Sequence, residues 1–206
     1  LWSGGPSLAS NLGWSSAIAV GGKILLFGGQ NSNAQNVNQV LELDPATNQW
    51  SQKAAMPTAR NSTKSVFFEG KVWVIGSYPS STTVEIYDPT TDSWATGPSL
   101  TTARSGSSVW AANGKIYVAG GLSGTSFFNT IESYNPVTNQ WAITGSAPEN
   151  KYDGAATVLG GMVYLIAGSP SDAVYSNKVF AADLIPHRDL YFQKVDVPAP
   201  GGDANA

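Results

Sequence analysis

The chain has 206 residues and a formal net charge of −3, with 11 Lys and Arg, 14 Asp and Glu and no cysteine. The lack of cysteine excludes disulfides, thiolate metal sites and a cysteine nucleophile. So few basic residues argue against a nucleic-acid partner, and no apolar run approaches the roughly 20 residues of a membrane span. Charged residues make up only 12% of the chain, so Ser, Thr and Asn carry its polarity, which is typical of strands and turns.

A repeat of roughly 47 residues runs through the chain. A seven-residue segment that begins with Asp or Asn, continues with Pro and ends in Trp occurs at residues 44–50, 88–94 and 135–141. Trp2 stands one period before Trp50. An apolar stretch that begins and ends with glycine keeps the same period, at residues 22–29, 70–76, 114–121 and 161–168. These two landmarks predict four repeat units.

Each unit is predicted to form four short antiparallel strands. The first strand holds small and apolar residues, at residues 15–20, 63–68, 107–112 and 155–159. The second follows a glycine turn and is apolar on both faces, as in a strand buried on both sides. The third alternates and leads into the Pro-containing turn, where Asn or Asp tolerates left-handed backbone, and the Trp opens the fourth. No ten-residue stretch has helical periodicity, so essentially no helix is expected.

The glycine pair, the Asp/Asn-Pro turn and the Trp six residues after the Asp or Asn together resemble the kelch repeat, over residues 1 to about 192. The resemblance implies an all-β, kelch-type β-propeller whose blades are four-stranded antiparallel sheets. In the fourth unit the turn and Trp are replaced, and its last strand is expected at residues 190–195 with Tyr191 or Phe192 in the place of Trp. We expect residues 1–8 to form a leftover outer strand and residues 198–206 a flexible C-terminal tail. The four blades are expected at residues 9–54 (blade 1), 55–98 (blade 2), 99–145 (blade 3) and 146–197 (blade 4).

The kelch resemblance implies six or seven blades, so four units leave the closure of the ring open. The chain is part of a longer propeller, completes a ring with a second copy or another chain, or closes as a small four-bladed ring. An open row of blades would expose an apolar flank. The missing Met and the leftover strand favour the first alternative, and the Pro/Gly/Ala-rich tail favours a natural C-terminus.

Cations recur where a loop enters the first strand of a unit. Eleven residues before the start of each second strand stand Leu12, Arg60, Arg104 and Lys151. The resemblance places ligands around the central channel at this end, so we expect these three cations to bind a sugar, a carboxylate or an acidic peptide. Alternatively, they pair with neighbouring loop carbonyls. The neighbours expected at the same mouth are Trp14, Asn61, Ser62, Ser105, Tyr152 and Asp153, with Gln30, Asn31, Tyr78, Ser123 and Ser169 on the bordering loops.

The remaining candidates weaken the case for an enzyme. Trp50, Trp94 and Trp141 are expected to pack between blades, whereas Trp14 and Trp110 depart from the repeat and are candidates for a specific contact. His187 is the only histidine and is expected in a solvated terminal turn, so a multi-histidine metal site is excluded. No nucleotide-binding glycine motif is present, and we expect neither a cofactor nor a metal.

The sequence favours a non-enzymatic propeller module that presents a loop face to a protein or carbohydrate ligand. The rival hypothesis is a sugar-transforming enzyme of the sialic-acid mutarotase kind, which resembles kelch propellers in fold. Glu149, Lys151, Tyr152 and Asp153 would then supply acid and base groups. A third hypothesis is a structural module with no ligand site. The composition is typical of a secreted or bacterial surface protein.

Overall fold

The computed structural model describes residues 4–184, 190 and 192–195, and the regular structure in this part of the chain is all β-strand. Four antiparallel sheets of four strands follow one another along the chain, as the repeat predicts. Blade 1 is β1 (Ser16–Val20), β2 (Lys23–Phe27), β3 (Val40–Asp44) and β4 (Gln49–Gln52). Blade 2 is β5 (Lys64–Phe68), β6 (Lys71–Ile75), β7 (Val84–Asp88) and β8 (Ser93–Thr96).

Blades 3 and 4 repeat this order. Blade 3 is β9 (Ser108–Ala112), β10 (Lys115–Ala119), β13 (Thr130–Asn135) and β14 (Gln140–Ser146), with a hairpin of β11 (Leu122–Ser123) and β12 (Ser126–Phe127) in its loop. Blade 4 is β15 (Ala155–Leu159), β16 (Met162–Ile166), β17 (Val179–Asp183) and β18 (Phe192–Val195). The described residues contain no helix that is long and apolar enough to cross a membrane.

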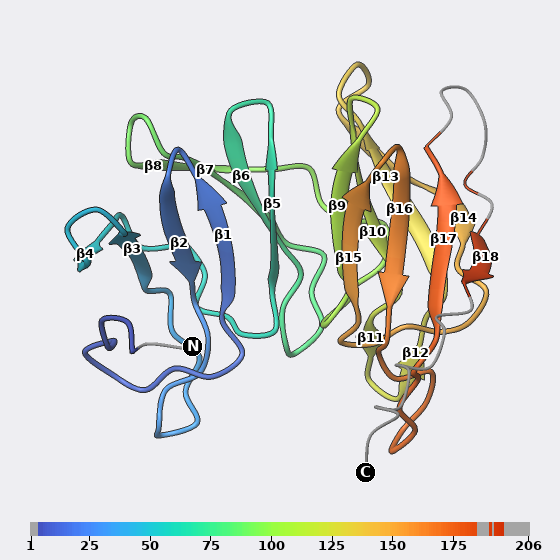
Figure 1. Cartoon of the computed structure of the whole chain (residues 1–206), viewed down its shortest axis with the longest axis horizontal. Helices are drawn as coiled ribbons and strands as arrows, with labels where there is room; N and C mark the ends of the chain where they lie inside the picture. Colours follow the sequence, from blue (N-terminus) through green and yellow to red (C-terminus); the bar gives the residue numbers. More distant parts are fainter. Residues whose placement is uncertain (1–3, 185–189, 191, 196–206) are drawn as a thin grey trace, which may run out of the picture.

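The blades form a propeller around a central channel. β1 packs against β5, β5 against β9 and β9 against β15, so the first strand of every blade is innermost. These four strands line a channel of ≈ 300 Å³, whose walls are mainly Ser and Ala side chains. Figure 1 looks across the propeller, with blade 1 at the left, blade 4 at the right and the innermost strands of the other two blades, β5 and β9, between them.

Apolar layers between consecutive blades form the core. In blades 2 and 3 the second strand contributes side chains from both of its faces to these layers, as predicted from its continuous apolar sequence. In blade 2, Val72 and Val74 pack towards Phe27 of blade 1, while Trp73 and Ile75 pack in the cluster shared with blade 3. A third cluster joins blades 3 and 4. Burial on both faces explains why these strands are apolar without alternation.

The Pro-containing turns form as predicted. The side chain at the first position of each turn accepts a hydrogen bond from the main-chain N–H two residues later, at 2.8–3.0 Å in Asp44, Asp88 and Asn135. The fifth position has a φ between 49° and 57°, at Asn48, Asp92 and Asn139. Asn and Asp are the residues that tolerate this left-handed conformation best.

The repeated tryptophans pack between blades, as expected. Trp94 of blade 2 contacts Phe27 of blade 1 edge-on at 5.9 Å, and its Nε1 donates to the carbonyl of Ala54 at 2.9 Å. Trp141 likewise donates to Pro98 of the preceding blade at 2.9 Å. In blade 4, Phe192 takes the place of Trp, because it is buried and pairs in register with Ala182. The predicted place of Phe192 is confirmed.

Other expectations at the chain ends differ or lie outside the structure. Residues 4–8 form no strand, in contrast to the outer strand predicted for residues 1–8. A strand forms by sharing main-chain hydrogen bonds with a neighbouring strand, and no other described strand lies beside this segment. His187 and the predicted tail at residues 198–206 lie outside the described residues.

Candidate functional site

The cation positions lie inside the blades rather than at an exposed mouth. Arg104 precedes β9, and both it and Glu132 of β13 are fully buried, with 2.9 Å between Nη2 and Oε1. The guanidinium also donates to the carbonyls of Gly120 at 2.6 Å and Thr130 at 3.1 Å. Burial lowers the pKa of the Arg104 guanidinium, and the Glu132 carboxylate opposes this shift. This pair fastens the loop that enters the innermost strand to the third strand of the same blade.

Arg60 repeats the arrangement in blade 2. It is 1% exposed, and its Nη2 lies 2.6 Å from Oε2 of Glu85. Its Nη1 and Nη2 also donate to three main-chain carbonyls, at 3.2–3.3 Å, in Val74, Gly76 and Thr83, whereas its buried Nε has no hydrogen-bond partner among the described residues. The Glu85 side chain also accepts from Thr58 at 2.7 Å. The second blade therefore uses its cation as an internal brace as well.

Lys151 of blade 4 is held in a different way. It is 1% exposed, its Nζ donates to the carbonyl of Ala167 at 2.6 Å, and the ammonium lies 4.9 Å from the centroid of the Phe180 ring. Glu149 lies 3.1 Å from the same Nζ and also binds Lys178 at 2.7 Å. Desolvation raises the pKa of Glu149, but the hydrogen bonds from Lys178, Ser176 and Lys151 outweigh it, so the pKa is lowered.

The expectation that these three cations face a ligand is therefore corrected. The buried cations have carboxylate or carbonyl partners within their own blades, so their charge is already compensated and shielded from solvent. The alternative of pairing with loop carbonyls describes them better. A sequence signal for this pairing exists, because in both Arg-containing blades a Glu stands near the start of the third strand, at Glu85 and Glu132.

Six of the remaining predicted residues gather around a hollow at the loop end of the channel. Its volume is ≈ 360 Å³, and its walls are aromatic, amide and hydroxyl side chains without a charged group: Trp14, Gln30, Asn61, Ser62, Tyr78 and Tyr152. Trp14 is 64% exposed and Tyr78 is 53% exposed. Three different blades supply these walls, so the hollow exists only because the propeller brings them together.

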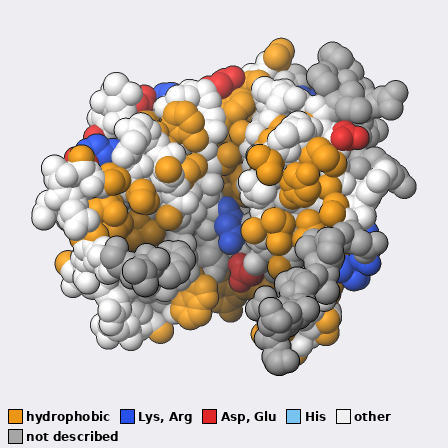
Figure 2. Space-filling view, in the orientation of Figure 1, with side chains coloured by type: hydrophobic (Ala, Val, Ile, Leu, Met, Phe, Trp, Pro, Cys, Tyr) orange, Lys and Arg blue, Asp and Glu red, His pale blue; other side chains and the backbone are white. Residues whose placement is uncertain are grey.

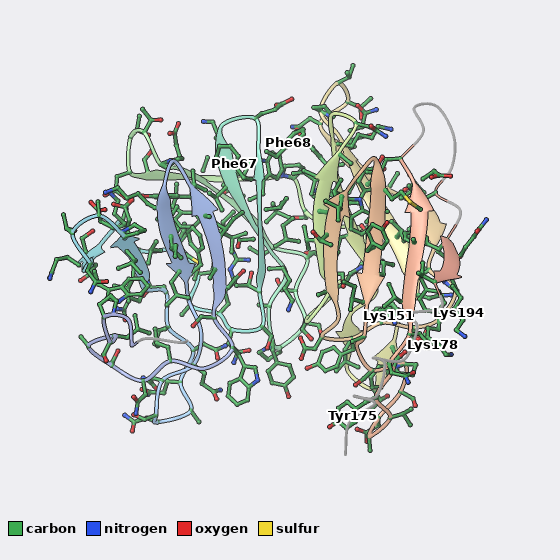
Figure 3. All side chains as sticks on the ribbon, viewed as in Figure 1. Phe67, Phe68, Lys151, Tyr175, Lys178 and Lys194 are labelled. Carbon is green, nitrogen blue, oxygen red and sulfur yellow. The ribbon has the colours of Figure 1, made fainter. Side chains whose placement is uncertain are left out.

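A second hollow of ≈ 410 Å³ adjoins the first, and Tyr152 lines both. Its walls come from the loops of blades 3 and 4: Leu122, Phe127, Tyr152, Asp153, Ser169, Ser171, Asp172, Ala173 and Tyr175. Figure 3 shows Tyr175 projecting from the lower end of blade 4. Phe67 and Phe68 of blade 2 lie at the opposite, upper end of the view. Tyr175 is 87% exposed. We call the two hollows together the mouth.

A chain of main-chain hydrogen bonds links the blades at the mouth. The amide of Ser62 donates to Trp14 at 2.9 Å, that of Gly106 to Ser62 at 3.2 Å, and that of Asp153 to Gly106 at 2.8 Å. All four residues have φ between 48° and 58°. A bulky residue such as Trp14 is held in this left-handed conformation by its surroundings rather than by its own preference.

In the described part of the chain, the walls of the mouth contain only two charged side chains, Asp153 and Asp172. Asp153 lies 3.7 Å from Nζ of Lys64, a pair that joins blade 4 to blade 2 with both side chains partly exposed. Desolvation raises the pKa of Tyr152, and the neighbouring Asp153 adds to the shift. The Tyr152 hydroxyl therefore stays protonated at neutral pH and can donate a hydrogen bond. No group of acidic or His side chains among the described residues could hold a metal ion.

The structure thus separates the predicted site residues into two groups. Trp14, Asn61, Tyr152 and Asp153 meet at the mouth with Gln30 and Tyr78, whereas Arg60, Arg104 and Lys151 are buried in the blades. Ser105 is 1% exposed and bridges to Leu122 through its main chain.

Trp110, a candidate for a specific contact, is instead 3% exposed and stacked on Tyr117 at 5.2 Å. It belongs to the apolar layer between blades 3 and 4. Phe127 and Tyr175 were missed as wall residues of the mouth, because their loops have no fixed offset in the repeat.

Comparison with known proteins agrees with this architecture. A family profile described as the KLHDC2/KLHL20/DRC7 Kelch-repeats domain matches residues 16–196. A solved structure titled "Structure of YjhT" superposes with a TM-score of 0.79 at 20% identity, over 95% of this chain and 68% of that chain. A search of curated proteins finds no match. The profile spans most of the repeats, and the chain therefore belongs to the Kelch-repeat domain family.

Proposed function

We propose that this propeller is a non-catalytic binding module that holds an uncharged carbohydrate at its mouth. One observation carries the proposal: the hollow around Trp14 combines exposed aromatic faces with amide and hydroxyl groups and has no charged wall residue. Aromatic rings stack on the apolar faces of sugar rings, and amides exchange hydrogen bonds with their hydroxyls. Trp14 and Tyr78 would supply the platforms, with Gln30 and Tyr152 as polar contacts.

The charge distribution supports a neutral ligand over an anionic one. The three cations that could attract a carboxylate are buried against their own partners. The carboxylate of Asp153 stands beside the hollow and is paired with Lys64 at 3.7 Å, so this pair offers no excess positive charge to an anion. A ligand that is neutral, or an uncharged segment of a protein, fits these walls better than an acidic sugar.

Two members of the acid–base cluster of the rival enzyme hypothesis, Glu149 and Lys151, are engaged inside the protein, whereas Tyr152 and Asp153 line the mouth. Glu149 accepts from Ser176 at 2.7 Å, in addition to its ion pairs with Lys151 and Lys178. Such a carboxylate is poorly placed to take a proton from a substrate, because its acceptor capacity is already used. These contacts favour binding without chemistry.

The experiment is a screen of neutral glycans, followed by calorimetric titration of variants. Trp14→Asn removes the aromatic face and keeps a residue that tolerates left-handed backbone. We expect it to weaken binding by about tenfold or more, roughly 1.4 kcal/mol. Phe67→Ala is the matched control, because Phe67 is a 43% exposed aromatic residue at the opposite end of the blades.

Unchanged affinity in Trp14→Asn, or an equal loss in Phe67→Ala, would contradict the assignment of the mouth. If a peptide binds at the mouth and no neutral glycan does, the proposed ligand class is wrong, but the mouth is still the binding surface. If NMR shows that the protein converts a bound sugar into another compound, its function is catalysis rather than binding.

A further inference from the structure

The second hollow of the mouth has aromatic walls. Phe127 of the β11–β12 hairpin and Tyr152 of the loop that enters β15 meet with their ring planes at 90° and their centroids 6.0 Å apart. Tyr175 supplies a third ring from the loop between β16 and β17, and it is 87% exposed. Three rings from three loop segments of blades 3 and 4 therefore converge on one hollow of ≈ 410 Å³.

The loop that carries Tyr175 is held in place by hydrogen bonds on both of its sides. Before Tyr175, the main chains of Tyr152 and Ser169 exchange two hydrogen bonds, at 3.0 and 2.8 Å. After it, the Ser176 hydroxyl donates to the Glu149 carboxylate at 2.7 Å. Because the loop is anchored in this way, less of the wall has to be ordered when a ligand binds, and ordering is one of the main costs of binding.

The charged groups on these walls are acidic. Of the residues that the structure describes, Asp153 and Asp172 line the hollow and no Lys or Arg does. Asp153 is paired with Lys64 at 3.7 Å, and Figure 2 shows basic and acidic side chains close together at the centre of the view. Asp172 is exposed and takes part in no ion pair within the described ranges. Lys178 on the same loop is already bound to Glu149 at 2.7 Å. The negative charge of Asp172 is therefore uncompensated.

We propose that this hollow binds an alkylammonium group, through its three aromatic rings and the carboxylate of Asp172. The quadrupole of an aromatic ring attracts an organic cation to the ring face, and a nearby carboxylate adds a charge of opposite sign. A metal ion fits these walls less well, because within the described residues no three acidic or His side chains come together. A neutral sugar would make no use of the charge of Asp172.

This site goes beyond the proposed glycan site of the first hollow. Tyr152 is the one described residue that lines both hollows. The first hollow has no charged wall residue, whereas the second has an acidic one without a partner, so the two hollows differ in the chemistry that they offer. The alkylammonium site does not depend on whether a glycan binds.

The test is titration of the protein with choline, measured by amide shifts in a two-dimensional NMR spectrum. We expect saturable shifts at Ser169, Asp172 and their neighbours. The compound 3,3-dimethyl-1-butanol has the shape of choline without its charge, and it should cause no saturable shifts. Nα-acetyl-lysine amide presents a primary ammonium as a protein side chain would, so the tighter binder of the two cations identifies the source of the group. Absence of saturable binding by either cation, or equal binding of the uncharged alcohol, would overturn the proposal.

Variants of the wall residues separate the ring from the charge. Tyr175→Ala should weaken binding of the cation about threefold or more, whereas Tyr175→Phe should keep it, because the ring face makes the contact. Phe67→Ala again serves as the aromatic control at the opposite end of the blades. Asp172→Asn removes the charge and keeps the size, and it should weaken binding about two- to fivefold.

Asp183→Asn is the matched control for the charge. It makes the same change at an exposed position at the far end of β17, beside Met162, and it should leave binding of the cation unchanged. An equal loss in Asp172→Asn and Asp183→Asn would mean that only the overall charge of the protein attracts the cation. That result, or an unchanged affinity in Tyr175→Ala, would overturn the proposed site.

Trp14→Asn distinguishes a failure of this inference from a failure of the proposed glycan function. It should leave choline binding unchanged, because Trp14 lines the first hollow and not the second. If no neutral glycan binds but choline does, the proposed function is contradicted and the alkylammonium site is supported. Loss of choline binding in Trp14→Asn would mean that the cation binds in the first hollow, and it would overturn the assignment to the second.

Discussion

Arg104 and Glu132 form an ion pair that is completely enclosed by blade 3, with Nη2 and Oε1 2.9 Å apart. The carboxylate also accepts the main-chain amides of Thr101 at 2.7 Å and Thr102 at 3.2 Å. The pair therefore joins a loop from the preceding blade's outer edge, the entry to β9 and strand β13. Its role is to hold the blade together.

Replacing one partner of this pair should destabilise the protein strongly. Arg104→Met leaves Glu132 charged and enclosed, and we expect a loss of about 3–5 kcal/mol of unfolding free energy, measured by urea denaturation. The double variant Arg104→Leu with Glu132→Leu reproduces the apolar residues of blade 1, Leu12 and Leu41, and should lose less than the single one. A double variant as unstable as the single one would contradict this account.

Lys151 should be easier to replace. Lys151→Met removes the bond to Ala167, but Glu149 keeps Lys178 and Ser176 as partners. The Met sulfur can still pack on the Phe180 ring. We expect a loss of about 1–2 kcal/mol by the same measurement. A loss as large as that of Arg104→Met would mean that Glu149 depends on Lys151 alone.

Glycine at the end of β6 is required by close approach of the next blade. A Cβ on Gly76, which has a φ of 68°, would lie 2.6 Å from the carbonyl oxygen of Arg104. Gly114 has the same φ, and a Cβ there meets nothing within 4 Å. Gly114→Ala should cost about 1–2 kcal/mol from its backbone conformation, and Gly76→Ala clearly more. Equal costs in thermal denaturation would contradict the predicted clash.

Asp92 should make stability depend on acid pH. Its carboxylate accepts from the Tyr87 hydroxyl at 2.7 Å and from the amide of Ala54 at 2.9 Å, and these bonds lower its pKa from the usual 3.8. Because the pKa is depressed in the folded state, the stabilisation is present above pH 3.8 and is lost as the pH falls through the folded value.

Urea midpoints between pH 7 and pH 2 test this. Asp92→Asn should flatten the acid limb of the curve. Asn139→Asp puts a carboxylate at the equivalent position of blade 3, where Tyr134 donates at 2.9 Å but Pro98 has no amide to give. It should therefore add a weaker acid dependence. An unchanged acid limb in Asp92→Asn would contradict the assignment.

The repeat predicts most of the fold because strand order, glycine turns and inter-blade tryptophans are all local patterns. Even the irregular fourth unit follows, since Phe192 fills the space of Trp. The direction of the Arg60 side chain could not be predicted in the same way. The Glu that recurs in the third strand indicates the pairing with Glu85, 25 residues away, but only the folded blade shows that the guanidinium turns inward rather than to the mouth. The exposed walls at Tyr175 have no counterpart in the other units.

The links between Trp14, Ser62, Gly106 and Asp153 use main-chain atoms only. The side chain at each of these positions is therefore not needed for the link, and the four blades do carry an indole, a hydroxyl, a hydrogen atom and a carboxylate there. The side chain can therefore differ at Trp14, Ser62 and Asp153 while the blades keep their spacing, but not at Gly106, where a Cβ would lie 2.5 Å from the Tyr152 ring. Single substitutions at these three positions would alter the chemistry of the mouth without changing the arrangement of the blades.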